Sequence, residues 1–218
     1  MKPPISYYGG LTCEDNMLLM ARYPDKYFEL AIVDPPYGVV DQWITGGNKC
    51  QTKNRPVFLD DKKMKEWDIK PSKEYFDELF RVSKNQIIFG GNNFELPPTR
   101  GFIIWDKGTT APSFAQYDYL WTSFNALPKL CDVRLLKGFL KEMPKIHPTQ
   151  KPIALYKWLL LNRAKIGDKI LDTHLGGGSI AIACLDMGFE LTGCELDTEY
   201  YLKMIDRIES HKIQLQIL

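Results

Sequence analysis

Short apolar runs alternate with amphipathic segments along most of the 218-residue chain. The runs that predict buried strands lie at 30–33, 86–89, 101–105, 117–124, 169–171 and 189–194. The segments that predict helices lie at 15–22, 71–80, 152–164, 180–187 and 197–211. Strands that alternate with helices predict an α/β fold built on one doubly wound, mostly parallel, Rossmann-like sheet.

Length and composition indicate how many domains the chain forms and where in the cell it works. The hydrophobic share of 44% and the charged share of 25% are ordinary for a folded protein, and the length suits one domain over residues 1–218. No apolar run is long enough to span a membrane, and no secretory signal is visible. The five cysteines are widely spaced and form no metal-binding pattern, so we expect reduced thiols, no metal and a cytoplasmic location.

The net charge of +1 says little, but the distribution of charge is uneven. Residues 129–151 hold six basic residues and two acidic ones. Such a stretch is typical of a face that contacts phosphates, or equally of a solvated surface. Residues 38–71 are polar and irregular, and a loop this long inside a compact domain usually serves a function.

Three acidic residues, Asp34, Asp172 and Glu195, each follow a predicted strand. The carboxyl ends of parallel strands meet at one edge of the sheet, and ligands bind there near the topological switch point. We therefore expect these carboxylates to share a site.

Residues 34–37 read Asp-Pro-Pro-Tyr directly after an apolar strand. An aromatic amino group is a poor nucleophile because its lone pair is delocalised into the ring. The Asp34 carboxylate and the Pro35 carbonyl can accept its hydrogens and localise that pair. Pro35 and Pro36 fix the turn, and Tyr37 can stack on the base. A plain strand-to-turn junction is the alternative interpretation.

Residues 172–179 read Asp-Thr-His-Leu-Gly-Gly-Gly-Ser between a predicted strand and a predicted helix. The glycines let the backbone approach a ligand, and the helix N-terminus favours negative charge such as a carboxylate. Glu195, at the end of the next strand, suits ribose hydroxyls. A nicotinamide cofactor would fit this loop too, but a dehydrogenase would leave residues 34–37 without a role.

Residues 147–152 read His-Pro-Thr-Gln-Lys-Pro before another predicted helix. Alone, this segment is typical of a capped helix start. Together, however, the three motifs resemble the amino-methyltransferases that modify DNA. Their order, with Asp-Pro-Pro-Tyr first and the glycine loop last, resembles the permuted β group of that family. Residues 85–94, 101–107 and 121–124 resemble its middle strands.

The resemblance implies an S-adenosylmethionine-dependent methyltransferase fold and assigns residue roles. The catalytic residues that it implies are Asp34, Pro35, Pro36 and Tyr37. The implied cofactor residues are Asp15 near the adenine, His147, Thr149 and Lys151 near the methionine end, Asp172, His174, Gly176, Gly178 and Ser179 in the loop, and Glu195 at the ribose.

The glycine loop departs from the family pattern Asp-Pro-Phe-x-Gly-Ser-Gly-Thr. Thr173 and His174 replace Pro-Phe, and Gly177 replaces serine. The extra glycine and the lost aromatic ring predict a looser hold on the cofactor, although His174 can pack as a flat ring. The region for target recognition is short, with residues 39–70 and 125–146 as the putative DNA-contacting segments. We therefore expect a short or degenerate target sequence, or a partner that helps to recognise the target.

We therefore predict a site-specific DNA methyltransferase of the restriction-modification kind that transfers a methyl group to N6 of a flipped-out adenine in duplex DNA. Aspartate at the first motif position, instead of serine, favours adenine in the resembling group. We expect the basic stretch 129–151, with Lys49, Lys53 and Arg55, to contact phosphates. Methylation of cytosine N4, methylation of RNA and a catalytically weak nucleic-acid-binding homologue stay open, as does a homodimer.

Overall fold

The computed structural model describes residues 5–8, 10–39, 68–108, 115–132 and 145–217. In this part of the chain the strands form one sheet with the order β1-β2-β9-β8-β3-β4-β6-β5-β7. The strands are β1 (Ile5–Tyr8), β2 (Leu11–Cys13), β3 (Phe28–Val33), β4 (Ser83–Phe89), β5 (Ile103–Asp106), β6 (Tyr117–Thr122), β7 (Lys129–Asp132), β8 (Lys169–Asp172) and β9 (Glu190–Glu195). The helices are α1 (Asn16–Met20), α4 (Lys73–Val82), the 3-10 turn η1 (Gly91–Asn93), α5 (Ile153–Arg163), α6 (Ser179–Met187) and α7 (Thr198–Ile217).

The centre of the sheet is parallel, which confirms the predicted doubly wound α/β fold. Strands β2, β9, β8, β3 and β4 pair in parallel, whereas β6 pairs antiparallel with both β4 and β5. The sequence did not predict β1, β2 or β7, which are short strands toward the two edges. β7 lies inside residues 125–146, one of the putative DNA-contacting segments.

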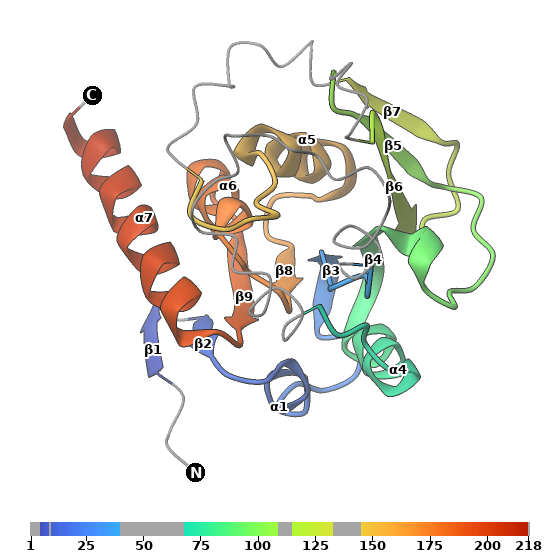
Figure 1. The fold of residues 1–218 in the computed structure, drawn as a ribbon, viewed down its shortest axis with the longest axis horizontal. Coiled ribbons are helices and arrows are strands. Elements are labelled where there is room, and N and C mark those ends of the chain that lie inside the picture. The colour runs from blue at the N-terminus through green and yellow to red at the C-terminus, as the bar shows by residue number, and fades with distance from the viewer. Residues whose placement is uncertain (1–4, 9, 40–67, 109–114, 133–144, 218) are drawn as a thin grey trace, which may run out of the picture.

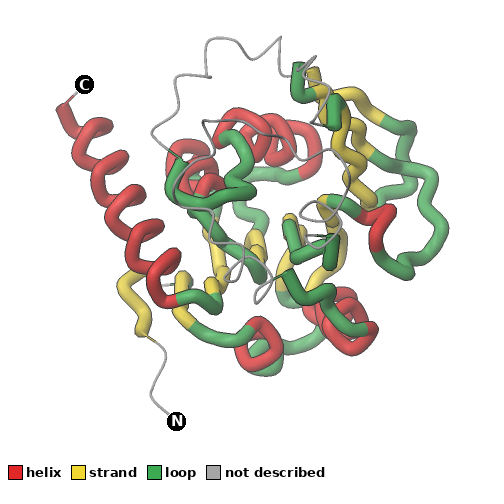
Figure 2. Tube along the Cα trace, viewed as in Figure 1, coloured by secondary structure: helices red, strands yellow, loops and turns green. Residues whose placement is uncertain are grey.

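Helices cover both faces of this sheet (Figures 1 and 2). Strand β3 explains the two layers, because its side chains alternate. Leu30 and Ile32 pack in the core under α5 and α6, whereas Ala31 and Val33 pack with α1 and α4. All four are essentially inaccessible to solvent, and burial of each larger side chain contributes about 1.5–3 kcal/mol.

The topological switch point lies between β3 and β8. From β3 the chain continues to β4 on one side, and from β8 it continues to β9 on the other. Asp34 follows β3, Asp172 ends β8 and Glu195 ends β9. The three predicted carboxylates therefore lie at the same edge of the sheet, where ligands bind in such folds.

The predicted last helix and its cap are confirmed. Asp197 caps α7 by accepting hydrogen bonds from the Glu199 and Tyr200 amides, and the helix runs to Ile217, beyond the predicted end at 211. Among the described residues no helix is long and apolar enough to cross a membrane. The described cysteines, all of them free thiols, are Cys13, Cys131, Cys184 and Cys194.

Candidate active site

The Asp34 carboxylate is engaged on both of its oxygens. Tyr37 donates its hydroxyl to Oδ1 at 2.7 Å, and Lys151 Nζ lies 2.6 Å from Oδ2. The Lys151 and Asp34 side chains are only 11% and 13% exposed, so little water screens the ion pair. The sequence predicted both motifs, but not that Lys151 of one would contact Asp34 of the other.

The Tyr37 ring packs on the turn after β4. A Cβ at Gly90, where φ is +61°, would lie 2.5 Å from two atoms of this ring, so glycine is required there. Phe94 meets the ring edge-on, with centroids 6.1 Å apart. Burial, reinforced by the nearby Asp34 charge, raises the pKa of Tyr37 well above its usual value, so its hydroxyl stays a donor at neutral pH. Pro35 is buried and Pro36 half-buried beside it.

Asp172 is the most buried acid of the site, with 1% of its surface exposed. Its Oδ1 accepts a hydrogen bond of 2.9 Å from the His174 amide, whereas Oδ2 has no partner within the described residues. Burial raises the pKa of Asp172 to about 8, the Asp34 and Glu195 charges act in the same direction, and the His174 hydrogen bond opposes them. An unpartnered buried carboxyl oxygen beside two further acids favours a ligand that carries positive charge or donates hydrogen bonds.

Glu195 fixes the glycine loop from the neighbouring strand. Its Oε2 accepts from the Gly176 amide at 2.8 Å, and its Oε1 accepts from the Asp197 amide at 2.9 Å. Burial raises the pKa of Glu195 in spite of these bonds. The residue therefore shapes the loop in addition to the ribose contact that the resemblance implies.

The segment 147–150 lies against the glycine loop. If each glycine of the loop carried a Cβ, that atom would lie against a neighbouring side chain. The neighbour is His147 at Gly176, Gln150 at Gly177 and Met204 at Gly178. Thr149 belongs to the same contact, since its Oγ1 lies 3.2 Å from His147 Nδ1. The structure thus brings together the predicted residues of the two cofactor motifs, and it adds Gln150 and Met204.

Arg207 holds this loop from behind. It is 5% exposed on α7 and donates through Nη1 to the Gly177 carbonyl and to Ser179 Oγ. The sequence carries a signal for this role, because Arg207 lies between Met204 and Ile208 on the apolar face of α7. A buried cation on an apolar helix face usually donates hydrogen bonds to buried acceptors.

The residues that replace Pro-Phe form a hydrogen-bonded network. Thr173 Oγ1 lies 2.7 Å from the Tyr75 hydroxyl and 2.9 Å from His174 Nδ1, and Asn16 Nδ2 lies 3.2 Å from His174 Nε2. Burial lowers the pKa of His174 to about 4, so the ring is neutral. Its edge-on contact with Tyr75 confirms that it packs as a flat ring. Thr173 and His174 therefore tie the loop to α1 and α4, whereas the looser hold on the cofactor stays a prediction.

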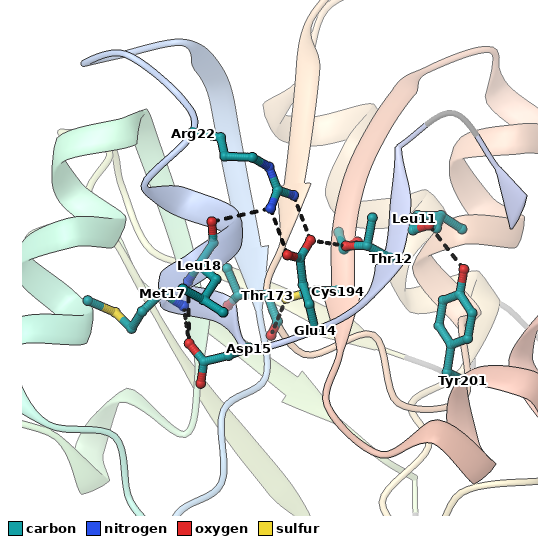
Figure 3. A network of polar contacts seen from close by, with 11 residues as sticks. Leu11, Thr12, Glu14, Asp15, Met17, Leu18, Arg22, Thr173, Cys194 and Tyr201 are labelled. Carbon is teal, nitrogen blue, oxygen red and sulfur yellow. Dashed lines mark hydrogen bonds and ion pairs between the residues drawn. The ribbon is translucent and has the colours of Figure 1, made fainter. Parts of the chain in front are cut away.

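Asp15, which we expected near the cofactor adenine, caps α1 (Figure 3). Its Oδ1 accepts from the amides of Met17 at 2.8 Å and Leu18 at 3.3 Å. The adjacent Glu14 pairs with Arg22 through both oxygens at 2.6 Å. Asp15 is thus held at a helix N-terminus beside β9, and its other oxygen faces away from these amides (Figure 3).

Lys151 corrects one expectation about the basic stretch. It is directed into the site and pairs with Asp34, so it is not a phosphate-contacting surface residue. Lys129 bonds the Asn162 side chain, and Lys145 is exposed. Of the basic residues that we expected to contact phosphates, six fall outside the described part of the chain: Lys49, Lys53, Arg55, Arg134, Lys137 and Lys141. Gly38, which directly precedes the 39–70 segment, donates its amide to the side chain of Asp68 near the end of that segment.

Restoring the family serine at Gly177 is expected to destabilise the protein. A new Cβ there would overlap Gln150, which is 7% exposed and accepts the Ile146 amide through Oε1. Gly177→Ser should therefore cost about 1–3 kcal/mol in urea unfolding. Adding Gln150→Ala should recover part of this cost, with an interaction energy of about 0.5–3 kcal/mol. Strictly additive costs would show that Gln150 does not require the glycine.

The chain is similar to known DNA methyltransferases. A family model described as DNA methylase, that of the N6 and N4 methyltransferases, matches residues 104–206. The Type II methyltransferase M.HpaI of Haemophilus parainfluenzae is 35% identical over 66 residues, 30% of this chain and 21% of that protein. M2.DpnII of Streptococcus pneumoniae, also a Type II methyltransferase, is 34% identical over 112 residues, 50% of this chain and 41% of that protein.

These matches identify the class of protein. Residues 104–206 belong to the DNA amino-methyltransferase family. The matched regions span less than half the length of either curated relative. The family match contains the segment 147–152 and the glycine loop, and the Asp-Pro-Pro-Tyr motif precedes it.

Solved structures support the fold over nearly the whole chain. The crystal structure of the M1.HpyAVI-SAM complex is 16% identical, with a TM-score of 0.55, and the match covers 91% of this chain and 98% of that one. The cytosine-N4-specific PvuII DNA methyltransferase is 12% identical, with a TM-score of 0.57, and the match covers 93% and 89%. At such identities the likeness confirms the Rossmann-like methyltransferase fold that the sequence predicted.

Proposed function

We propose that this protein is an S-adenosylmethionine-dependent DNA methyltransferase that modifies the N6 amino group of adenine. The observation that carries the proposal is the position of Asp34. Its carboxylate lies at the switch point of the sheet, in the same carboxylate cluster as Asp172 and Glu195, which flank the glycine loop. An acceptor for an amino group and a loop for the cofactor therefore occupy one site.

The residues present fit S-adenosylmethionine. This cofactor carries a sulfonium and an ammonium group against a single carboxylate, so its net charge is positive. The unpartnered Oδ2 of Asp172 and the nearby carboxylates of Asp34 and Glu195 suit such a cation. Residues 174–179 and 147–151 would hold it, with Arg207 fixing the loop behind them.

Asp34 and its neighbours would activate the target amino group. When bound, the cofactor supplies an electrophilic methyl group. The Asp34 carboxylate and the Pro35 carbonyl accept hydrogen bonds from the amino hydrogens, which localises the nitrogen lone pair for attack. Tyr37 confines the base, and Asp34 is placed to receive the proton that the methylated nitrogen releases.

Adenine is the proposed base because the motif begins with Asp34 and not with serine. Cytosine N4 is the second candidate, since PvuII methyltransferase shares the fold and is cytosine-N4-specific. Duplex DNA is the proposed partner, with the base flipped out to reach a carboxylate that is only 13% exposed.

Long-read sequencing of DNA from cells that express the protein tests this proposal. We expect modified adenines in one short or degenerate sequence context, and none in cells that express Asp34→Asn. Modified cytosines in place of modified adenines would support the second candidate, cytosine N4. Parallel assays of methyl incorporation into duplex DNA and RNA would reveal an RNA enzyme, and failure to bind S-adenosylmethionine in calorimetry would indicate a nucleic-acid-binding homologue.

A further inference from the structure

Both oxygens of the carboxylate that should receive the target amino group are engaged by the protein itself. Lys151 Nζ lies 2.6 Å from Asp34 Oδ2, and the Tyr37 hydroxyl occupies Oδ1 at 2.7 Å. The Lys151 ammonium also lies 5.3 Å from the centroid of the Phe89 ring and 5.9 Å from that of Tyr37. Both oxygens that could accept amino hydrogens thus already have donors, and a cation stands beside them.

This arrangement conflicts with catalysis in two ways. A carboxylate paired with an ammonium is a weaker acceptor for an uncharged amino group, because the charged donor makes the stronger hydrogen bond. The ammonium would also repel a sulfonium brought close to Asp34. Both effects favour a reactive state in which Lys151 has left Asp34.

The segment that carries Lys151 also contacts the cofactor loop. His147 faces Gly176 and Gln150 faces Gly177, within four residues of Lys151. Residues 145–152 form no helix or strand, so the lysine is not fixed by a regular backbone ladder. The sole anionic group of S-adenosylmethionine is its carboxylate, which is the natural new partner for a displaced ammonium.

We propose that Lys151 couples the two halves of the reaction by exchanging Asp34 for the cofactor carboxylate. Without cofactor, Lys151 keeps Asp34 closed to the target base. With cofactor, Asp34 is released, so base flipping follows cofactor binding. The inference rests on the proposed function, and it assigns to Lys151 a positioning role and not a catalytic one.

Fluorescence of a flipped base tests the exchange. The probe is a duplex with the target sequence found by long-read sequencing and 2-aminopurine at the methylated position. S-adenosylhomocysteine, which has the carboxylate, should tighten probe binding with flipping by roughly 5- to 150-fold, the usual range of coupling between sites. Methylthioadenosine, which lacks the amino-acid part, should bind without this effect.

Variants at position 151 separate the exchange from a structural role. Lys151→Met should bind and flip the probe without any cofactor, and S-adenosylhomocysteine should add little. Lys151→Arg should keep the dependence. The matched control is Lys157→Met, because Lys157 forms a 2.6 Å pair with Asp186 on α6, away from Asp34; it should keep the wild-type dependence as well.

The opposite results overturn the inference. They are a wild-type protein that flips the probe equally with and without S-adenosylhomocysteine, or a folded Lys151→Met variant that still depends on it. A Lys151→Met variant that does not fold leaves the comparison of the two ligands on wild-type protein as the deciding measurement. If sequencing finds no modified base, both the proposed function and this inference fail. If the protein methylates DNA but flips the probe independently of S-adenosylhomocysteine, only the role of Lys151 fails.

Discussion

Replacing Asp34 with asparagine is expected to lower the rate of methyl transfer by at least about a hundredfold, the loss seen when one preorganised polar group is removed from an active site. Asparagine keeps the size of the side chain, but its Nδ2 presents hydrogens where Oδ2 now accepts from Lys151. The amino group of the base would then meet a donor instead of an acceptor. Single-turnover incorporation of a labelled methyl group measures the rate.

The control for this variant keeps the same chemical change at a remote site. Asp77→Asn removes an exposed carboxylate that pairs with Lys73 on α4, and its rate should equal that of the wild type. Cofactor binding by Asp34→Asn, measured by calorimetry, should remain. A folded Asp34→Asn variant that methylates at the wild-type rate would remove Asp34 from the mechanism.

Replacing Asp172 with asparagine is expected to change both cofactor binding and the pH dependence of stability. The pKa of Asp172 is about 8 in the folded protein, whereas an aspartate in an unfolded chain titrates near about 3.9. Between these values the unfolded state has lost a proton that the folded state retains. The unfolding free energy therefore falls as pH rises from about 4 to about 8, by up to about 1.4 kcal/mol per pH unit.

The asparagine variant has no such titration, so its stability relative to the wild type should increase across that window and level off above it. Urea unfolding at several pH values measures this difference. The same variant should lose most of the thermal stabilisation that S-adenosylmethionine gives the wild type, because the buried carboxyl group that can ionise beside the cationic ligand is gone.

Asp186→Asn provides a control of opposite sign. Burial alone would raise the pKa of Asp186, but its hydrogen bonds with Lys157 and His211 outweigh burial and hold it below the usual value. Its ionised form therefore stabilises the folded protein above the unfolded pKa, and this variant should lose stability at neutral pH. Parallel pH profiles for the wild type and Asp172→Asn would show that Asp172 does not titrate as described.

The sequence was sufficient for the central sheet. Runs such as 30–33 and 87–89 are apolar at every position, as strands buried on both faces must be, and the helix after β9 begins at a recognisable cap, Asp197. It was not sufficient for β7 and the β1–β2 pair. Leu130 is exposed and only Cys131 of β7 is buried, so the edge strand leaves a weak hydrophobic pattern.

Local motifs predicted which residues gather in the site, but not how they pair. Asp34, Asp172 and Glu195 converge because each ends a parallel strand, which follows from chain topology. The Lys151–Asp34 pair joins positions 117 residues apart, and Arg207 reaches the glycine loop from α7. Such contacts depend on tertiary packing, and a spacing rule along one helix or strand cannot reveal them.

The proposed function is tested most directly by mass spectrometry of nucleosides from unmethylated duplex DNA that has been incubated with the purified protein and S-adenosylmethionine. We predict N6-methyldeoxyadenosine in the wild-type reaction, and its absence with Asp34→Asn. N4-methyldeoxycytidine without N6-methyldeoxyadenosine would contradict the assignment of the base. No methylated nucleoside from a protein that binds the cofactor would contradict the assignment of the reaction.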